Sequence, residues 1–134
     1  WNGEGAPQDL AAAVAWWRRI ADQGHANAEC WLGYAYEKGM GVQRDVDHAV
    51  IWYERASANG SATAAGNMGW CYEFGTGLPR DLDEAAAYYQ LAANRNLPRG
   101  HYRLGLMYEA GEPMAQDVLR ASQCFKRAYE LLAH

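Results

Sequence analysis

Hydrophobic and polar positions recur along this chain with a period of 36 residues. The clearest markers are four aspartates at that spacing: Asp9, Asp45, Asp81 and Asp117. An alanine follows each aspartate after four positions, and two large or apolar residues follow after seven and eight. A fixed period of this size is typical of stacked-repeat architectures, because one supersecondary unit cannot bury its apolar face alone.

Each repeat contains two helical patterns. In the first, apolar residues such as Ala28, Leu32 and Ala35 fall on one helix face. This pattern predicts first-type helices over residues 26–38, 62–74 and 99–110. In the second, the recurring apolar stripe includes Trp16 and Trp17 and their counterparts in later repeats. It predicts second-type helices over residues 9–23, 45–59, 81–95 and 117–134.

The repeated aspartates and glycines fit the ends and contacts of these helices. An N-cap aspartate accepts a hydrogen bond from an orphan backbone N–H, so all four aspartates are predicted N-caps. Left-handed C-caps are predicted at Gly39, Gly75 and Gly111. A glycine inside a helix costs about 1 kcal/mol relative to alanine. We therefore expect an aromatic of the partner helix to pack on each interior glycine, namely Gly33, Gly69 and Gly105.

These columns resemble the Sel1-like repeat, a relative of the tetratricopeptide repeat. The first copy carries the pattern at Leu32-Gly33, Tyr36, Gly39, Gly41, Asp45, Ala49, Trp52-Tyr53 and Ala56. The second copy keeps it well, whereas the third departs most, at residues 96–100, and its turn has Pro113 where the others have glycine. The resemblance spans essentially the whole chain. It implies an all-α fold, an α-solenoid in which antiparallel helix pairs form a right-handed superhelix.

We predict a single Sel1-like repeat domain over residues 1–134. It would comprise about three full repeats, a partial N-terminal repeat and a C-terminal capping helix. Residues 3–9 align with residues 39–45, so the start of the sequence resembles the end of an earlier repeat. We therefore expect the chain to be a fragment of a longer protein. Interspersed polar residues in the final helix are typical of a solenoid end cap.

Composition and charge narrow the class of partner. A chain of 134 residues that is 50% hydrophobic suits one domain with a continuous core. The net charge of −4 and the lack of a Lys/Arg stripe argue against nucleic acid and anionic membranes. No apolar run approaches the roughly 18 residues that span a bilayer. The expected partners are another protein or peptide segment and the remaining repeats of the parent chain.

The sequence gives little support for catalysis. No two of the four histidines stand at metal-ligand spacing, and no glycine-rich phosphate loop is present. The cysteines, Cys30, Cys71 and Cys124, fall in three different repeat columns and form no C-x-x-C motif. The columns of Cys71 and Cys124 predict buried core thiols. We expect no metal site, no cofactor and no enzymatic activity.

The resemblance implies a scaffold or adaptor that binds its partner on the concave face, which the first helix of each pair lines. Counted from the interior glycines, the predicted partner-binding residues are Asn27, Cys30, Tyr34, Glu37, Thr63, Gly66, Trp70, Glu73, Arg99, Tyr102, Leu106 and Glu109.

An apolar row runs through these positions at Tyr34, Trp70 and Leu106. It is either a set of exposed interface anchors or a completion of the core, and both interpretations stay open. The small residues Thr63 and Gly66 predict space for a bulky partner side chain beside Trp70.

An acidic ladder runs beside that row at Glu37, Glu73 and Glu109. It could attract a basic segment. It could also be a solvated polar edge, which we favour because acidic residues are common at this position of the family.

Three functions remain in competition. The first is the scaffold, and the second is a bacterial inhibitor or immunity protein that neutralises a secreted toxin enzyme. The third and most remote is a β-lactam-binding or β-lactam-hydrolysing protein, whose relatives carry a regular cysteine pair in each repeat. Relatives are often exported, which favours the bacterial periplasm or cell envelope. Cysteines without such a pairing pattern fit the cytoplasm slightly better, so the compartment stays open.

Overall fold

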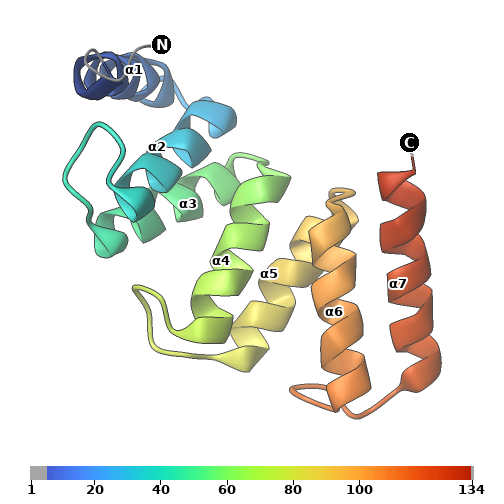
Figure 1. Ribbon diagram of the computed structural model, residues 1–134. Coiled ribbons are helices and arrows are strands. Elements are labelled where there is room, and N and C mark those ends of the chain that lie inside the picture. The colour runs from blue at the N-terminus through green and yellow to red at the C-terminus, as the bar shows by residue number, and fades with distance from the viewer. Residues whose placement is uncertain (1–5, 134) are drawn as a thin grey trace. The chain divides into compact units, whose positions relative to one another are not determined.

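The computed structural model describes residues 6–133, which fold into α-helices joined by short turns (Figure 1). The helices within this range are α1 (Ala6–Ala21), α2 (Ala26–Lys38), α3 (Val46–Ala58), α4 (Ala62–Phe74), α5 (Leu82–Asn94), α6 (Pro98–Ala110) and α7 (Val118–Leu132). No strand occurs in residues 6–133. The chain divides into two compact units: unit 1, Trp1–Ser61, contains α1 to α3, and unit 2, Ala62–His134, contains α4 to α7.

The first-type helices confirm the sequence pattern closely. Helices α2 and α4 have the predicted bounds, and α6 begins at Pro98, one residue before the predicted start. Proline suits the first turn of a helix because its missing N–H would have no partner there. The predicted left-handed C-caps are also confirmed, with φ of 71° at Gly39, 68° at Gly75 and 79° at Gly111. The peptide bond before Pro113 is cis, so the turn of the third copy differs.

Three of the four predicted aspartate caps are confirmed. Asp45, Asp81 and Asp117 are the N-caps of α3, α5 and α7, and each accepts a hydrogen bond from a backbone N–H of the first turn. The prediction for Asp9 is wrong, because α1 begins at Ala6 and Asp9 lies within its first turn. There its charge still favours the positive end of the helix dipole.

Interior glycines set the distance between the two helices of each repeat. An aromatic ring of the partner helix packs on each glycine, as expected, and the rings are those of Tyr53, Tyr89 and Phe125. A Cβ atom added at Gly33, Gly69 or Gly105 would lie 2.5, 2.6 or 2.6 Å from a ring carbon of these partners. Such a distance is shorter than any ordinary contact, so each ring occupies the space that a side chain would need.

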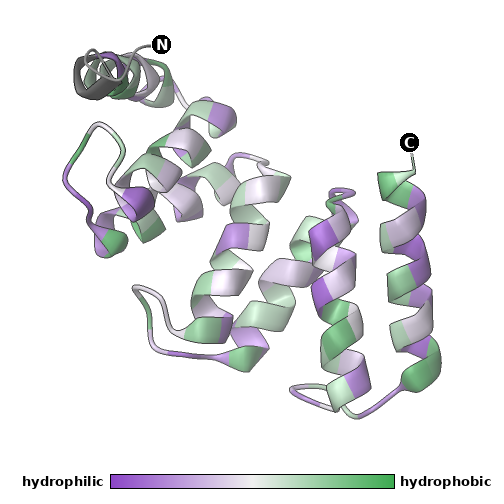
Figure 2. Ribbon diagram, viewed as in Figure 1, coloured by the Kyte–Doolittle hydropathy of each residue, from purple (hydrophilic) through white to green (hydrophobic). Residues whose placement is uncertain are grey.

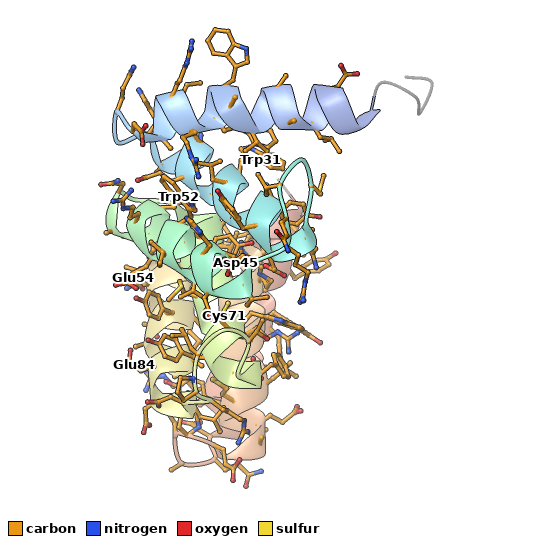
Figure 3. All side chains as sticks on the ribbon, turned by 90° about the vertical axis from the view of Figure 1, so that its left-hand side faces the viewer. Trp31, Asp45, Trp52, Glu54, Cys71 and Glu84 are labelled. Atoms are coloured by element: carbon orange, nitrogen blue, oxygen red, sulfur yellow. The ribbon has the colours of Figure 1, made fainter. Side chains whose placement is uncertain are left out.

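The core of unit 1 lies between its three helices. Its buried members are Val14, Ala21, Ala28, Leu32, Ala35 and Trp52. Trp52 of α3, labelled in Figure 3, is only 5% exposed. Trp16 of α1 occupies the same repeat column but is 63% exposed, and Ile20 is 40% exposed. The predicted apolar stripe is therefore only partly buried in α1, because no helix precedes α1 within the described residues to cover it.

The core of unit 2 includes a cluster between α5 and α6. Its buried members are Ala85, Tyr89, Ala93, Leu104 and Met107. Helix α4 adds further buried residues, among them Met68 and Cys71. Cys71 is buried as predicted, but Cys124 is only partly buried at the edge of this core, so that prediction is wrong in degree. Burial nevertheless raises the pKa of the Cys124 thiol above its usual value, with the nearby charge of Arg120 acting in the opposite direction. Hydrophobic and hydrophilic residues alternate around each helix, as Figure 2 shows.

Candidate functional site

The predicted partner-binding positions all lie on α2, α4 and α6, but they differ in exposure. The exposed ones are Asn27, Tyr34, Thr63, Trp70, Arg99, Tyr102 and Glu109. The partly buried ones are Cys30, Glu37, Glu73 and Leu106. Gly66 is buried. Most of the predicted surface is therefore accessible to a partner within each unit.

Two members of the predicted acidic ladder are hydrogen-bond acceptors inside their own repeats. The Tyr53 hydroxyl donates to Glu37 over 2.7 Å, and the Tyr89 hydroxyl donates to Glu73 over 2.6 Å. Both tyrosine rings are buried. The third glutamate, Glu109, is exposed, and its repeat has a phenylalanine where the others have tyrosine. The repeated glutamate is thus a structural acceptor in two copies and a surface charge in the third.

The Tyr89 hydroxyl is strongly held in its protonated form. Burial, the hydrogen bond to Glu73 and the charge of Glu73, in that order, raise the pKa of Tyr89 far above its usual value. The positive charges of Arg103 and Arg99 act in the opposite direction. Deprotonation would place two negative charges at hydrogen-bond distance, so this contact requires the neutral phenol.

Replacement of Tyr89 by phenylalanine is expected to lower the free energy of unfolding by about 1–2 kcal/mol, the typical value of a part-buried hydrogen bond to a charged group. Because the folded-state pKa is raised, this contribution is fully present below about pH 10, the unfolded value, and is lost as the pH rises towards the folded-state pKa. Chemical denaturation of both proteins at about pH 8 and about pH 11 tests this. A stability difference that grows with pH would contradict it.

At Gly66, side-chain atoms of the chain itself lie in the space predicted beside Trp70. A Cβ atom at Gly66 would lie 2.7 Å from the Leu97 side chain and 2.8 Å from the Arg99 guanidinium. Residues at the start of α6 therefore fill the position that the sequence suggested for a partner side chain. Both groups are the ends of flexible side chains, so the pocket at Thr63 and Gly66 stays a prediction.

An exposed aromatic cluster with a stacked arginine lies on α4 and α6, and we call it the Trp70 cluster. The rings of Trp70 and Phe74 are 4.2 Å apart between centroids, and the two residues are 40% and 50% exposed. The guanidinium carbon of Arg103 lies 4.7 Å from the Trp70 centroid and 5.7 Å from that of Phe74. Of these residues, sequence reasoning found only Trp70. Phe74 lies one helical turn beyond it, so extending the exposed row along α4 would have found it too.

Unit 1 has a second aromatic cluster, on α1 and α2. Trp31 stacks on Trp17 at 5.6 Å between centroids and meets the Tyr34 ring edge-on at 6.1 Å. Trp31, labelled in Figure 3 beneath α1, is 53% exposed and was missing from the predicted site. The Lys38 ammonium group lies 6.0 Å from the Tyr34 centroid. In this cluster, Trp31 contacts a residue of α1. In the Trp70 cluster, α4 supplies two exposed aromatic rings and α6 supplies the guanidinium group.

An apolar cavity of about 510 Å³ lies beside α6 and α7 in unit 2. Its lining residues are Pro98, Arg99, Tyr102, Phe125, Ala128, Tyr129 and Leu132. One repeat earlier, the first turn of α6 packs on the equivalent surface: a Cβ at Gly100 would lie 2.6 Å from the Ala93 nitrogen and 2.8 Å from the Tyr89 carbonyl oxygen. The cavity therefore has the geometry of a surface on which repeats stack.

The described residues contain no group of three or more His, Cys, Asp or Glu side chains arranged to hold a metal ion. Within the same part of the chain, no helix is both long and apolar enough to cross a membrane. Cys30, Cys71 and Cys124 are thiols and not disulfide halves.

A 36-residue period, paired helices and the absence of strands in residues 6–133 define an all-α helical-repeat protein of the solenoid class. The model of the Sel1 repeat family matches residues 1–25, 26–61, 62–97 and 98–131. The chain belongs to the Sel1 repeat family. Proteins of this family are generally scaffolds for protein interactions and are typically non-enzymatic.

Several solved structures share the fold, and three of them illustrate the likeness. A Sel1 repeat protein from Oxalobacter formigenes matches with a TM-score of 0.87 and 30% identity, over 91% of this chain and 50% of that one. A protective antigen of uropathogenic Escherichia coli with an SLR fold matches with a TM-score of 0.86 and 36% identity, over 90% of this chain and 26% of that one. The chain thus spans half of the first structure and about a quarter of the second.

The third structure, cysteine rich protein B of Helicobacter pylori, matches with a TM-score of 0.74 over 97% of this chain and 93% of that one. At 23% identity this likeness concerns the fold alone. No curated protein sequence matches the chain significantly.

Proposed function

We propose that this chain is a non-enzymatic interaction scaffold and that α4 and α6 of unit 2 bind a peptide or protein segment. The observation that carries the proposal is the Trp70 cluster, in which exposed aromatic rings carry a stacked guanidinium. Trp and Arg are the residue types that most often dominate the energy of protein interfaces. Large exposed aromatic groups on a soluble surface are typical of interaction sites.

The arrangement of the cluster also favours binding over a purely structural role. Trp70 and Phe74 lie one turn apart on α4, outside the buried core of unit 2. The Arg103 guanidinium group of α6 lies over both rings, so residues of two helices contact one another in this surface without a partner. Preordering lowers the entropy that a binding surface loses on association.

To test this proposal, peptides that bind the intact protein are selected from a random display library. Trp70→Ala is expected to weaken the binding of the selected peptides by about 2 kcal/mol, which raises Kd about thirtyfold. Trp16→Ala serves as the control, because Trp16 is an exposed tryptophan on α1 outside this cluster. The Kd values are measured by fluorescence anisotropy, and circular dichroism verifies that both variants fold.

If the folded Trp70→Ala variant bound the selected peptides with unchanged affinity, the Trp70 cluster would not be the binding site. Affinity capture from the source cell with the wild-type and Trp70→Ala proteins then distinguishes two roles. Several partners that depend on Trp70 support a scaffold. A single secreted toxin enzyme as the Trp70-dependent partner would indicate the inhibitor function instead.

A further inference from the structure

Two arginines stand one helical turn apart on the α6 face that meets α4. Arg99 is exposed and Arg103 is partly buried. The ion pairs found in the described residues are Lys38–Glu37, His48–Asp45 and Arg127–Glu130. Neither Arg99 nor Arg103 is therefore paired with a carboxylate of the described chain. Like charges four residues apart on a helix repel each other, so this pair does not stabilise α6.

Contacts with α4 hold both guanidinium groups in place. Arg99 Nη2 donates a hydrogen bond to Asn67 Oδ1 over 2.8 Å and lies 3.5 Å from the Thr63 carbonyl oxygen. Arg103 is held by the rings of the Trp70 cluster, and its buried Nε atom has no hydrogen-bond partner. Ring stacking rather than a protein acceptor therefore fixes Arg103. Guanidinium donors in fixed positions without a carboxylate are suited to binding anionic groups.

The carboxylates near this surface form no ion pair with either arginine in the described residues. Glu73 keeps its negative charge while it accepts the Tyr89 hydrogen bond, and the charges of Glu73, Arg103 and Arg99 all act on Tyr89. One such carboxylate against two arginines leaves a net positive charge. Glu109 lies in the last turn of α6, away from the first two turns that carry the arginines. Positive charge thus adjoins the exposed rings of Trp70 and Phe74.

Resting on the proposed function, we propose that this surface recognises an acidic segment: aspartate or glutamate side chains next to a bulky hydrophobic residue. The carboxylates bind the Arg99 and Arg103 guanidinium groups, and the hydrophobic side chain packs on Trp70 and Phe74. Two guanidinium groups one turn apart match two acidic side chains better than a single terminal carboxylate. This is the opposite charge preference from that of the predicted acidic ladder.

Short fluorescent peptides with blocked ends test the charge preference on the intact protein. Each has one central tryptophan, flanked by glutamates, by glutamines or by lysines. The glutamate peptide is expected to bind at least about tenfold more tightly than the glutamine peptide, because charge-assisted hydrogen bonds form only with the former. Its affinity is expected to fall as the salt concentration rises to about 0.5 M. A glutamine peptide with a free C-terminal carboxylate tests that other source of negative charge.

Variants connect the preference to the two arginines. Arg99→Gln and Arg103→Gln are each expected to weaken the glutamate peptide about fivefold or more and to leave the glutamine peptide nearly unchanged. Arg103→Lys keeps the positive charge, so binding of the glutamate peptide should retain most of its salt dependence. This variant shows whether weaker binding of Arg103→Gln comes from the lost charge or from a disturbed fold. Arg127→Gln is the matched control, since Arg127 lies on α7 and pairs with Glu130.

The outcomes separate this proposal from the general function. Equal binding of glutamate and glutamine peptides, tighter binding of the lysine peptide, or no binding of the glutamate peptide overturns the acidic preference. If the glutamine peptide binds tightly once its C-terminal carboxylate is free, the surface recognises a terminal carboxylate and not acidic side chains. In each of these cases, library-selected peptides that still depend on Trp70 would leave the proposed binding function intact.

Discussion

Replacement of Trp52 by alanine is expected to lower the free energy of unfolding by about 3–5 kcal/mol, the usual cost of truncating a buried tryptophan. Replacement of Trp16 is expected to change it by less than about 0.5 kcal/mol, as is usual for exposed positions. Both tryptophans occupy the same column of the 36-residue repeat. The comparison therefore tests the effect of tertiary surroundings at constant repeat position.

The difference follows from what each indole contacts. Trp52 is 5% exposed and packs among buried residues of α1 and α2, so its truncation would leave a cavity between the three helices. Its buried Nε1 atom has no hydrogen-bond partner, so the loss is one of packing rather than of a hydrogen bond. The exposed Trp16 carries only a stacked Arg19, at 5.6 Å, and such an exposed contact contributes about 0.5–1 kcal/mol at most.

Urea denaturation followed by circular dichroism measures both effects, with the slope of the transition showing whether unfolding remains two-state. Similar losses for the two variants would mean that Trp16 is covered in solution. A small loss for Trp52→Ala would mean that the core of unit 1 does not contribute to the measured transition.

Substitution of Gly69 by alanine is expected to destabilise the protein by about 1–2 kcal/mol, although alanine is the better helix former by about 1 kcal/mol. The new methyl group would lie 2.6 Å from the Tyr89 ring. This ring is fully buried and its hydroxyl is held by Glu73, so it cannot move aside without losing contacts. An overpacking cost of about 2–3 kcal/mol, the upper part of the usual range, therefore exceeds the gain of about 1 kcal/mol in helix propensity.

The opposite substitution at an exposed helical position is the control for propensity. Ala87 is exposed in the middle of α5, so Ala87→Gly should cost about 1 kcal/mol by propensity alone. Thermal or urea unfolding measures both variants. If Gly69→Ala were stabilising, the α4–α5 distance would have to relax readily, and the proposed role of the interior glycines would be incorrect.

Local sequence signals predicted the helices because each signal acts within a few residues. Asp45, Asp81 and Asp117 cap their helices through hydrogen bonds that span two or three residues. The same signal failed at Asp9, where Pro7 falls within an earlier first turn, a position that proline favours. Capping residues indicate a helix start, but a competing start signal a few residues away can replace them.

The candidate site was only partly predictable. The helical period placed Trp70 and Arg99 on the correct helices because the spacing along a helix fixes which face a residue occupies. It could not show that Arg99 and Leu97 fill the space at Gly66, because that contact joins α4 to the start of α6. Arg103 was missed for the same reason, since its contact with the α4 rings has no signature in the sequence of α6.

The sequence alone determined the repeat, the helix pairs, the left-handed glycine caps and the family, because each depends on residues that are near one another or recur at a fixed spacing. Only the tertiary structure decided which member of a repeated column is buried and which is exposed. Trp52 and Trp16 are equivalent in sequence, and the helices packed around each one give it a different environment. Burial and hydrogen bonding depend on those neighbours, and a repeat pattern does not specify them.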